Sequence, residues 1–134
     1  MSLIVDASVA VKWFSEEAQS DRAESLLSSM EPLIAPDLVI AEIGNALWKK
    51  AARQLLRRDQ ATKAMVDAPT FFDRLIPLGD LGPRAVEIAI ELRHPIYDCF
   101  YLALAERERA PIVSADDKLL AAAKRMKSVE GRRV

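Results

Sequence analysis

The sequence has almost none of the side chains that act as nucleophiles or proton shuttles in many enzymes. Cys99 is its only cysteine and His94 its only histidine. One cysteine excludes an internal disulfide and cannot form a cysteine-based zinc site alone, and we expect it to be a small buried side chain on an apolar helix. A Ser-His-Asp or Cys-His mechanism would depend entirely on His94. Because His94 precedes Pro95, we expect a loop residue with no other role.

Long apolar runs are also absent. No run approaches the ~20 residues that a membrane-spanning helix needs, and Asp6 interrupts the first apolar stretch, unlike the apolar region of a secretion signal. We therefore expect no membrane partner and a cytoplasmic location. Hydrophobic residues make up 51% of the chain and charged residues 29%, which is typical of a globular protein. A length of 134 residues suits one domain over residues 1–134.

The net charge of −1 conceals an uneven distribution of charge. Residues 47–58 contain five basic side chains and no acid, and residues 118–134 contain six basic side chains and one acid. Basic segments favour a polyanionic partner when they lie beside a binding crevice. Solvated helix faces produce the same pattern, so both interpretations stay open on charge alone.

Apolar periodicity predicts an α/β fold. We expect strands at residues 2–5, 33–35, 75–78 and 112–114, and an edge strand at 128–134. We expect helices from about residue 9 and at residues 17–30, 38–55, 59–72, 83–92, 97–109 and 117–126. Strands that alternate with helices predict a parallel sheet covered on both faces.

Four carboxylates stand near the points where strands or loops give way to helices: Asp6, Glu42, Asp98 and Asp116. In a parallel sheet, strand C-termini and helix N-termini lie along one edge, so we expect these side chains in one crevice. Grouped carboxylates resist ionising together, and a bound Mg²⁺ or Mn²⁺ ion would remove that difficulty. Singly, each acid could serve only as a helix cap or as a partner of a helix dipole.

A polar stripe continues from one of these acids along the predicted helix at 38–55. Glu42, Lys49 and Arg53 fall within ~40° of each other at helical spacing, and Asn45 lies next to them. A phosphodiester chain held at the metal could therefore run along this helix, with Lys49 and Arg53 as substrate-binding residues. Two divalent ions can activate water and neutralise the leaving oxygen of such a substrate without help from histidine or cysteine.

Four stretches together are more specific than any one of them. They are residues 4–8 (IVDAS), 35–38 (APDL) with 42–48 (EIGNALW), 95–106 (PIYDCFYLALAE) and 113–116 (VSAD). In order and spacing, across essentially the whole chain, they resemble PIN-domain proteins of the VapC-type toxin group. The resemblance implies a three-layer α/β/α fold around a central parallel sheet of four to five short strands. It also implies endonucleolytic cleavage of RNA with Mg²⁺ or Mn²⁺, a homodimer, and a cognate antitoxin that blocks the site.

The resemblance also implies roles for individual residues. The acidic quartet carries over to Asp6, Glu42, Asp98 and Asp116, with polar support from Ser8, Asn45 and Ser114. Ser114 stands where such sequences often have threonine, which preserves the hydroxyl. Asp117 competes with Asp116 for the fourth acidic position, and we choose Asp116 because it is adjacent to the strand. Ser8 is also expected to cap the first helix, from about Val9.

Other functions are compatible with parts of the pattern. A haloacid-dehalogenase-type site needs a second Asp at the position of Ser8, and a response-regulator receiver needs paired acids where Asp6 stands alone, so both are disfavoured. An RNA-processing nuclease without a toxin role, an RNA-binding module without catalysis and a protein-binding module remain open. Groove shape decides which RNA is cut, and spacing alone fixes neither that RNA nor the number of ions.

Overall fold

Five short strands form one fully parallel sheet in the computed structural model, which describes residues 1–134. The strands are β1 (Leu3–Val5), β2 (Leu33–Pro36), β3 (Arg74–Ile76), β4 (Ile112–Ser114) and β5 (Gly131–Arg133). Their order across the sheet is β3-β2-β1-β4-β5. The first strand of the chain is therefore central and the last lies at an edge, which confirms the predicted parallel sheet and its edge strand.

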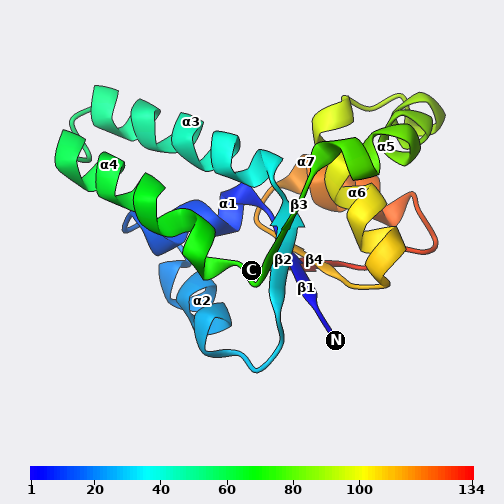
Figure 1. Cartoon of the computed structure of the whole chain (residues 1–134), viewed down its shortest axis with the longest axis horizontal. Helices are drawn as coiled ribbons and strands as arrows, with labels where there is room; N and C mark the ends of the chain where they lie inside the picture. Colours follow the sequence, from blue (N-terminus) through cyan, green and yellow to red (C-terminus); the bar gives the residue numbers. More distant parts are fainter.

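Helices cover both faces of this sheet. They are α1 (Ala7–Ala10), α2 (Ser20–Ser25), α3 (Leu38–Ala52), α4 (Arg58–Asp67), α5 (Leu78–Leu92), α6 (Ile96–Glu108) and α7 (Asp117–Lys124), with short 3₁₀ helices at Val11–Trp13, Leu26–Ser28 and Ala68–Phe71. Figure 1 shows α1 to α4 on one side of the strands and α5 and α6 on the other. This arrangement confirms the three-layer α/β/α fold. No helix combines the length and the apolar character needed to cross a bilayer.

The central strand shows why these apolar runs become strands. Leu3, Ile4 and Val5 are at most 4% exposed, because a strand covered by helices on both faces buries every side chain rather than alternate ones. Ile4 pairs with Ile34 on one side and Ile112 on the other. The residue that follows β1, Asp6, is therefore delivered to the middle of the sheet edge.

Helix α6 is the buried helix of the opposite layer. It packs against β1, β2, β4 and α5, and its buried side chains are Cys99, Tyr101, Leu102, Ala103, Leu104 and Ala105. Cys99 is thus a small core residue, as expected. Burial raises the pKa of its thiol to about 11, so the sulfur stays protonated and is a poor nucleophile at neutral pH.

The long helix α3 ends three residues earlier than expected. Gln54 adopts a left-handed conformation with φ of 60°. Its N–H donates to the carbonyl of Ala51, and the N–H of Leu55 donates to the carbonyl of Lys50. These two bonds form a Schellman motif, which satisfies the last carbonyls of the helix. The helix therefore ends at Ala52 with Arg53 as its C-cap, and the predicted polar stripe does not extend to Arg53.

Helix α5 begins five residues earlier than expected. Pro83 was expected in the first turn of this helix, after a turn that begins at Gly79, yet Gly79 already lies inside the helix and Pro83 lies further along it. The strand before it ends at Ile76, and Pro77 occupies the N-cap position, where its carbonyl accepts the N–H of Asp80. Pro83 comes early in the helix and removes only the single backbone bond that its own N–H would have made.

Two predicted helices are shorter than their apolar patterns suggested. The helix expected at 17–30 is α2 with a 3₁₀ turn, because hydroxyls of Ser25 and Ser28 bond back to main-chain carbonyls and compete with regular helix formation. The helix expected at 59–72 is α4 with a 3₁₀ turn that contains Pro69, which cannot donate to the preceding turn. Asp59 does not cap α4, since the Gln60 side chain accepts the N–H of Arg57 instead.

Candidate active site

The site is built where β1 and β4 end side by side. Asp6 follows β1 and caps α1, and Asp116 follows β4 and caps α7. Because β1 and β4 are parallel neighbours, both carboxylates emerge at the same edge of the sheet. We had expected Ser8 to cap α1, but the N-cap is Asp6. Asp6 therefore caps a helix and also belongs to the acidic group.

Asp6 is the most buried of the four acids, at 4% exposed. Its Oδ1 accepts hydrogen bonds from Ser8 Oγ at 2.7 Å and from the Val9 N–H at 3.3 Å, and its Oδ2 accepts one from Ser114 Oγ at 2.7 Å. Burial raises the pKa of Asp6 from 3.8 to about 6, in spite of these hydrogen bonds, and the charge of Asp116 adds to the rise. The carboxylate is thus held rigidly and is costly to ionise without a cation.

The two serines join the loops that carry the acids. Ser8 Oγ accepts the N–H of Ala115 and Ser114 Oγ accepts the N–H of Asp116, both at 2.9 Å. The two hydroxyls lie 3.4 Å apart. Each serine therefore donates a hydrogen bond to Asp6 and accepts one from the backbone that leads to Asp116. The two serines thus position Asp6 and Asp116 relative to each other.

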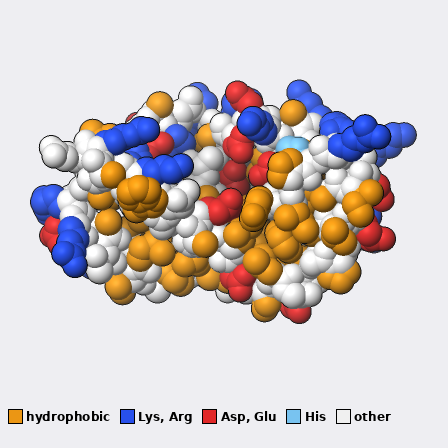
Figure 2. Space-filling model, turned by 90° about the horizontal axis from the view of Figure 1, so that it is seen from above, with side chains coloured by type: hydrophobic (Ala, Val, Ile, Leu, Met, Phe, Trp, Pro, Cys, Tyr) orange, Lys and Arg blue, Asp and Glu red, His pale blue; other side chains and the backbone are white.

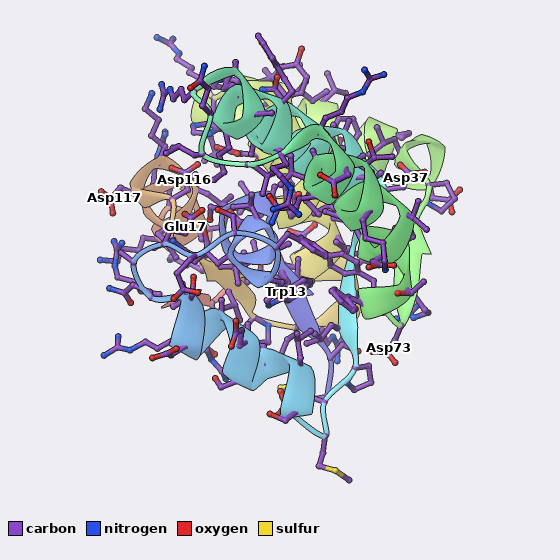
Figure 3. All side chains as sticks on the ribbon, turned by 90° about the vertical axis from the view of Figure 1, so that its left-hand side faces the viewer. Trp13, Glu17, Asp37, Asp73, Asp116 and Asp117 are labelled. Atoms are coloured by element: carbon purple, nitrogen blue, oxygen red, sulfur yellow. The ribbon has the colours of Figure 1, made fainter.

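Asp116 and Asp117 differ in what they face. Asp116 Oδ1 accepts the N–H of Lys118 at 2.9 Å, and its charge acts on both Asp6 and Glu42. The Asp117 side chain is 84% exposed and pairs with Arg133 at 2.5 Å, and Figure 3 shows it pointing away from the body of the molecule. The geometry favours Asp116 as the fourth acid.

Glu42, in the second turn of α3, has a partner that sequence reasoning missed. Tyr101, only 1% exposed, donates its hydroxyl to Glu42 Oε1 at 2.7 Å. Burial raises the pKa of Glu42, with Asp98 and Asp116 adding to the rise and the Tyr101 hydrogen bond opposing it. Burial also raises the pKa of Tyr101 well above its ordinary value, so the phenol remains a donor. The signal in the sequence was its position three residues after Asp98, on the same face of a helix.

The expectation that His94 has no other role is wrong. Its Nε2 lies 2.7 Å from Oδ2 of Asp98. Helix α5 ends at Leu92 with Arg93 in a left-handed conformation, and this turn brings His94 back over the first turn of α6. The spacing of four residues between His94 and Asp98 was the available signal.

The four acids are neighbours but do not form a closed cage. The charge of Asp98 acts on Glu42, and that of Asp116 acts on both Glu42 and Asp6. No three carboxyl, imidazole or thiol groups converge tightly enough to enclose an ion. Glu42, Asp98 and Asp116 each use one oxygen in a hydrogen bond within the protein and leave the other without one. These three oxygens are free of hydrogen bonds, and Oδ2 of Asp6, which accepts only the Ser114 hydroxyl, keeps a second lone pair for a cation.

The stripe on α3 is only partly as expected. Glu42, Asn45 and Lys49 line one cavity of about 410 Å³ together with Tyr97 of α6, but Arg53 lies beyond the end of the helix and does not line it. Asn45 does not hold any of the acids, because its Oδ1 accepts the indole N–H of Trp48 at 3.0 Å. It belongs to the wall of the groove and not to the support of the acids.

Lys49 and its neighbour Lys50 have different surroundings. The Lys50 ammonium lies 2.9 Å from Glu17, which also pairs with the buried Lys12 at 3.1 Å. Lys49 forms no ion pair and faces the cavity that begins at Glu42. Figure 2, which views the molecule from above, shows Asp and Glu side chains across a central hollow with Lys and Arg side chains on both sides. The acidic centre therefore lies between cationic flanks.

Comparisons with known proteins show the family of this chain. The model of the family described as PIN domain matches residues 3–125. The chain is 34% identical over 121 residues to "Ribonuclease VapC3" of Pyrobaculum aerophilum, covering 89% of this chain and 92% of that protein.

Two solved structures share the fold at lower identity. VapC20 of Mycobacterium tuberculosis, described as a sarcin-ricin loop cleaving toxin, superposes with a TM-score of 0.72 at 20% identity, over 90% of this chain and 95% of that one. A chain of a toxin–antitoxin complex from Klebsiella pneumoniae superposes with a TM-score of 0.69 at 18% identity, over 96% of this chain and 95% of that one.

Proposed function

Because this chain belongs to the PIN-domain family and is a homologue of the VapC ribonucleases, we propose that it is a Mg²⁺- or Mn²⁺-dependent endoribonuclease. Its catalytic and metal-binding residues would be Asp6, Glu42, Asp98 and Asp116. The observation that carries the proposal is the gathering of four acids at one edge of the sheet, three of them with an oxygen free of hydrogen bonds, beside a groove that contains Lys49.

The donor set fits a hard divalent cation. All the side-chain ligands available are carboxylate oxygens, and Mg²⁺ uses one or two of these and keeps several waters. An arrangement that does not enclose an ion with three side chains is therefore compatible with this metal. Burial is the main cause of the raised pKa values of Asp6 and Glu42, and the charges of neighbouring acids add to the rise. Both effects disfavour the ionised carboxylates, and a bound cation would offset them.

The residues of the chain would divide the work among themselves. Ser8 and Ser114 hold the Asp6 carboxylate, Tyr101 holds Glu42, and Lys49 attracts the phosphates of the RNA along α3. When bound, the divalent ion supplies activation of water and neutralisation of the leaving oxygen. The buried serine, tyrosine and acid network keeps these oxygens preorganised, so that little rearrangement is needed as charge develops.

An RNA cleavage assay tests the proposal directly. Labelled RNA incubated with the protein and Mg²⁺ or Mn²⁺ should give internal cleavage products, and EDTA should abolish them. The Asp98→Asn variant should be inactive while retaining its circular dichroism spectrum and the capacity to bind RNA. RNA that is bound but never cut under any metal condition would identify a binding module without catalysis.

The relatives suggest a biological role as the toxin of a toxin–antitoxin pair. A related structure is a toxin–antitoxin complex, and a homologue that matches 89% of this chain carries the name VapC3. A cognate antitoxin would bind this chain and block the acidic crevice. Expression with and without a small neighbouring gene tests this: arrest of growth by this chain alone, relieved by the neighbour, is the expected result. Harmless expression of an active nuclease would favour an RNA-processing role.

A surface suitable for homodimer formation lies on the helices opposite α3. Val86 and Ile90 of α5 are 44% and 72% exposed and Tyr97 of α6 is 61% exposed, and Val86 and Ile90 share one helix face by their spacing. Exposed apolar groups of this size favour association. Ile90→Glu is expected to convert a dimer to a monomer in light scattering, and a wild-type protein that is monomeric would refute the dimer.

A further inference from the structure

The second basic segment of the sequence, residues 118–134, is not explained by the α3 groove. In the structure its six basic side chains differ in their partners. Arg132 pairs with Glu130, and Arg133 with Asp117. Lys118, Lys124, Arg125 and Lys127 form no ion pair. Of these four, Lys118 and Arg125 line a cavity of about 380 Å³ together with His94, Pro95 and Asp98, so they are the unpaired cations of this segment that lie beside the acidic centre.

This cavity lies on the other side of the acids from the α3 groove. The α3 groove is lined by Glu42, Lys49 and Tyr97, whereas this one is lined by Asp98, the residue next to Tyr97, and by residues of α7. Asp98 is close enough to Glu42 for its charge to raise the pKa of Glu42. The acidic centre therefore lies between the two cavities. Figure 2 shows Asp and Glu side chains in the middle of this face, with Lys and Arg side chains on either side.

The cavity is preorganised. Arg125 donates from Nη1 to the main-chain carbonyl of Leu92 at 2.8 Å, which fixes the guanidinium and leaves its other N–H groups available. The His94 ring is held against Asp98 at 2.7 Å, and it is mostly buried at 16% exposed. Lys118 lies in the first turn of α7, where its main-chain N–H donates to the carboxylate of the N-cap Asp116. A fixed guanidinium beside an exposed ammonium is a donor set for a phosphate group.

We propose that Lys118 and Arg125 form a second phosphate subsite, which binds an RNA backbone phosphate on the side of the cut opposite to the phosphate held by Lys49. A single strand would then cross the acidic centre, with one neighbouring phosphate in each cavity. The proposal rests on the proposed ribonuclease function, since it assigns a role in RNA binding. It gives Arg125 and Lys118 the role of substrate-positioning residues.

Binding measurements with a charge-matched control test the subsite. Fluorescence anisotropy with a labelled single-stranded RNA would be carried out in the Asp6→Asn background, so that the RNA stays intact. Lys118→Ala should weaken binding about threefold to tenfold and lower the salt slope by about 0.7. Lys124→Ala on the same helix removes the same charge. Because Lys124 lines a different cavity, with Asp117 and Gly131, this variant should leave the RNA affinity and the salt slope unchanged.

Single uncharged methylphosphonate linkages in the RNA then locate the contact. One linkage on each side of the cleaved bond should weaken binding to the parent protein. Lys118→Ala should become insensitive to one of these two linkages and Lys49→Ala to the other. This pattern cannot arise from a general loss of positive charge.

The outcomes separate the two proposals. If the chain with intact acids cuts RNA, but Lys118→Ala and Lys124→Ala bind equally well and respond to the same linkages, the subsite is refuted and the nuclease stands. If the chain neither cuts nor binds RNA with Mg²⁺ or Mn²⁺, the proposed function fails and the subsite with it. Unchanged melting temperatures for Lys118→Ala and Lys124→Ala should accompany either result, since both side chains are exposed.

Discussion

The hydroxyl of Tyr101, in the buried layer of α6, donates to Oε1 of Glu42 on α3 at 2.7 Å. This bond links helices from opposite faces of the sheet, and it orients the glutamate so that Oε1 is used and Oε2 is free. Removal of a donor from a buried carboxylate costs more than the loss of an exposed hydrogen bond, because the acceptor keeps its desolvation penalty.

Tyr101→Phe therefore tests the positioning of Glu42. The ring still fills the core, but Glu42 loses the hydrogen bond that opposes the rise of its pKa, so its charged form is disfavoured further. We expect weaker Mn²⁺ binding in calorimetry and a lower cleavage rate. Tyr97→Phe is the matched control for metal binding, because the Tyr97 hydroxyl is exposed and bonds none of the acids, so the Mn²⁺ affinity of this variant should equal that of wild type. Equal Mn²⁺ affinity in both variants would show that Tyr101 has only a packing role.

Ser114→Ala should reduce stability more than an ordinary surface change. Ser114 is fully buried and joins Asp6 to the main-chain N–H of Asp116, so alanine leaves an unpaired N–H and a carboxylate with one donor fewer. We expect a loss of about 1–3 kcal/mol, measured by urea unfolding. Ser114→Thr retains the hydroxyl and should recover most of the loss, whereas equal losses in both variants would contradict this account.

The raised pKa of Asp6 predicts a pH-dependent stability of the metal-free protein. Its folded pKa of about 6 lies above the ordinary 3.8, so between these values the folded state binds more protons than the unfolded state. The contribution of Asp6 to stability therefore decreases as the pH rises from 4 towards 6 and stays low above that. Thermal melting of wild type and Asp6→Asn from about pH 4 to 7 should show that the variant loses part of this dependence. A parallel pair of curves would contradict it.

Cation binding should have the opposite dependence on pH. A divalent ion binds the ionised carboxylate, so Asp6 must lose its proton on binding. Below about pH 6 we expect the Mn²⁺ affinity of wild type to fall and the number of protons released per bound ion to rise. Calorimetry in buffers of different ionisation enthalpy measures this release, and binding without any proton release near pH 6 would show that Asp6 is already ionised.

Adjacent lysines on α3 provide a test of the substrate groove. Lys49 faces the cavity with no ion pair, while Lys50 is held by Glu17. Lys49→Ala should weaken RNA binding and lower the salt slope by about 0.7, whereas Lys50→Ala should affect stability more than binding. Arg53→Ala is expected to have a smaller effect on binding than Lys49→Ala, because α3 ends before it. A reversed order would show that the RNA follows another path.

The strands and the sheet edge were predictable because their signals are local. Buried runs such as Leu3–Val5 and Ile112–Ser114 need apolar side chains on both faces, and an acid that follows such a run marks the strand end. The start of α5 was not predictable in this way. Gly79 and Pro83 have the same local preferences in a turn and in the first turns of a helix, and packing against α6 decides between them.

The roles of single polar residues depended on contacts between distant elements. Tyr101 resembles any other aromatic in the core of α6, and only its approach to Glu42, 59 residues earlier in the sequence, gives it a partner. Asn45 was expected to support the acids and is instead bound by Trp48 one helical turn later. His94 was judged from its neighbour Pro95, although a turn at Arg93 returns it to Asp98.

The pairing of Asp6 with Ser114 joins residues 108 positions apart, across the central strand β1 and its neighbour β4. During translation β1 is made long before β4. A nascent chain that stops before β4 lacks both a neighbour of the central strand and a hydroxyl that holds Asp6. Truncated products without β4 therefore have no assembled acidic centre.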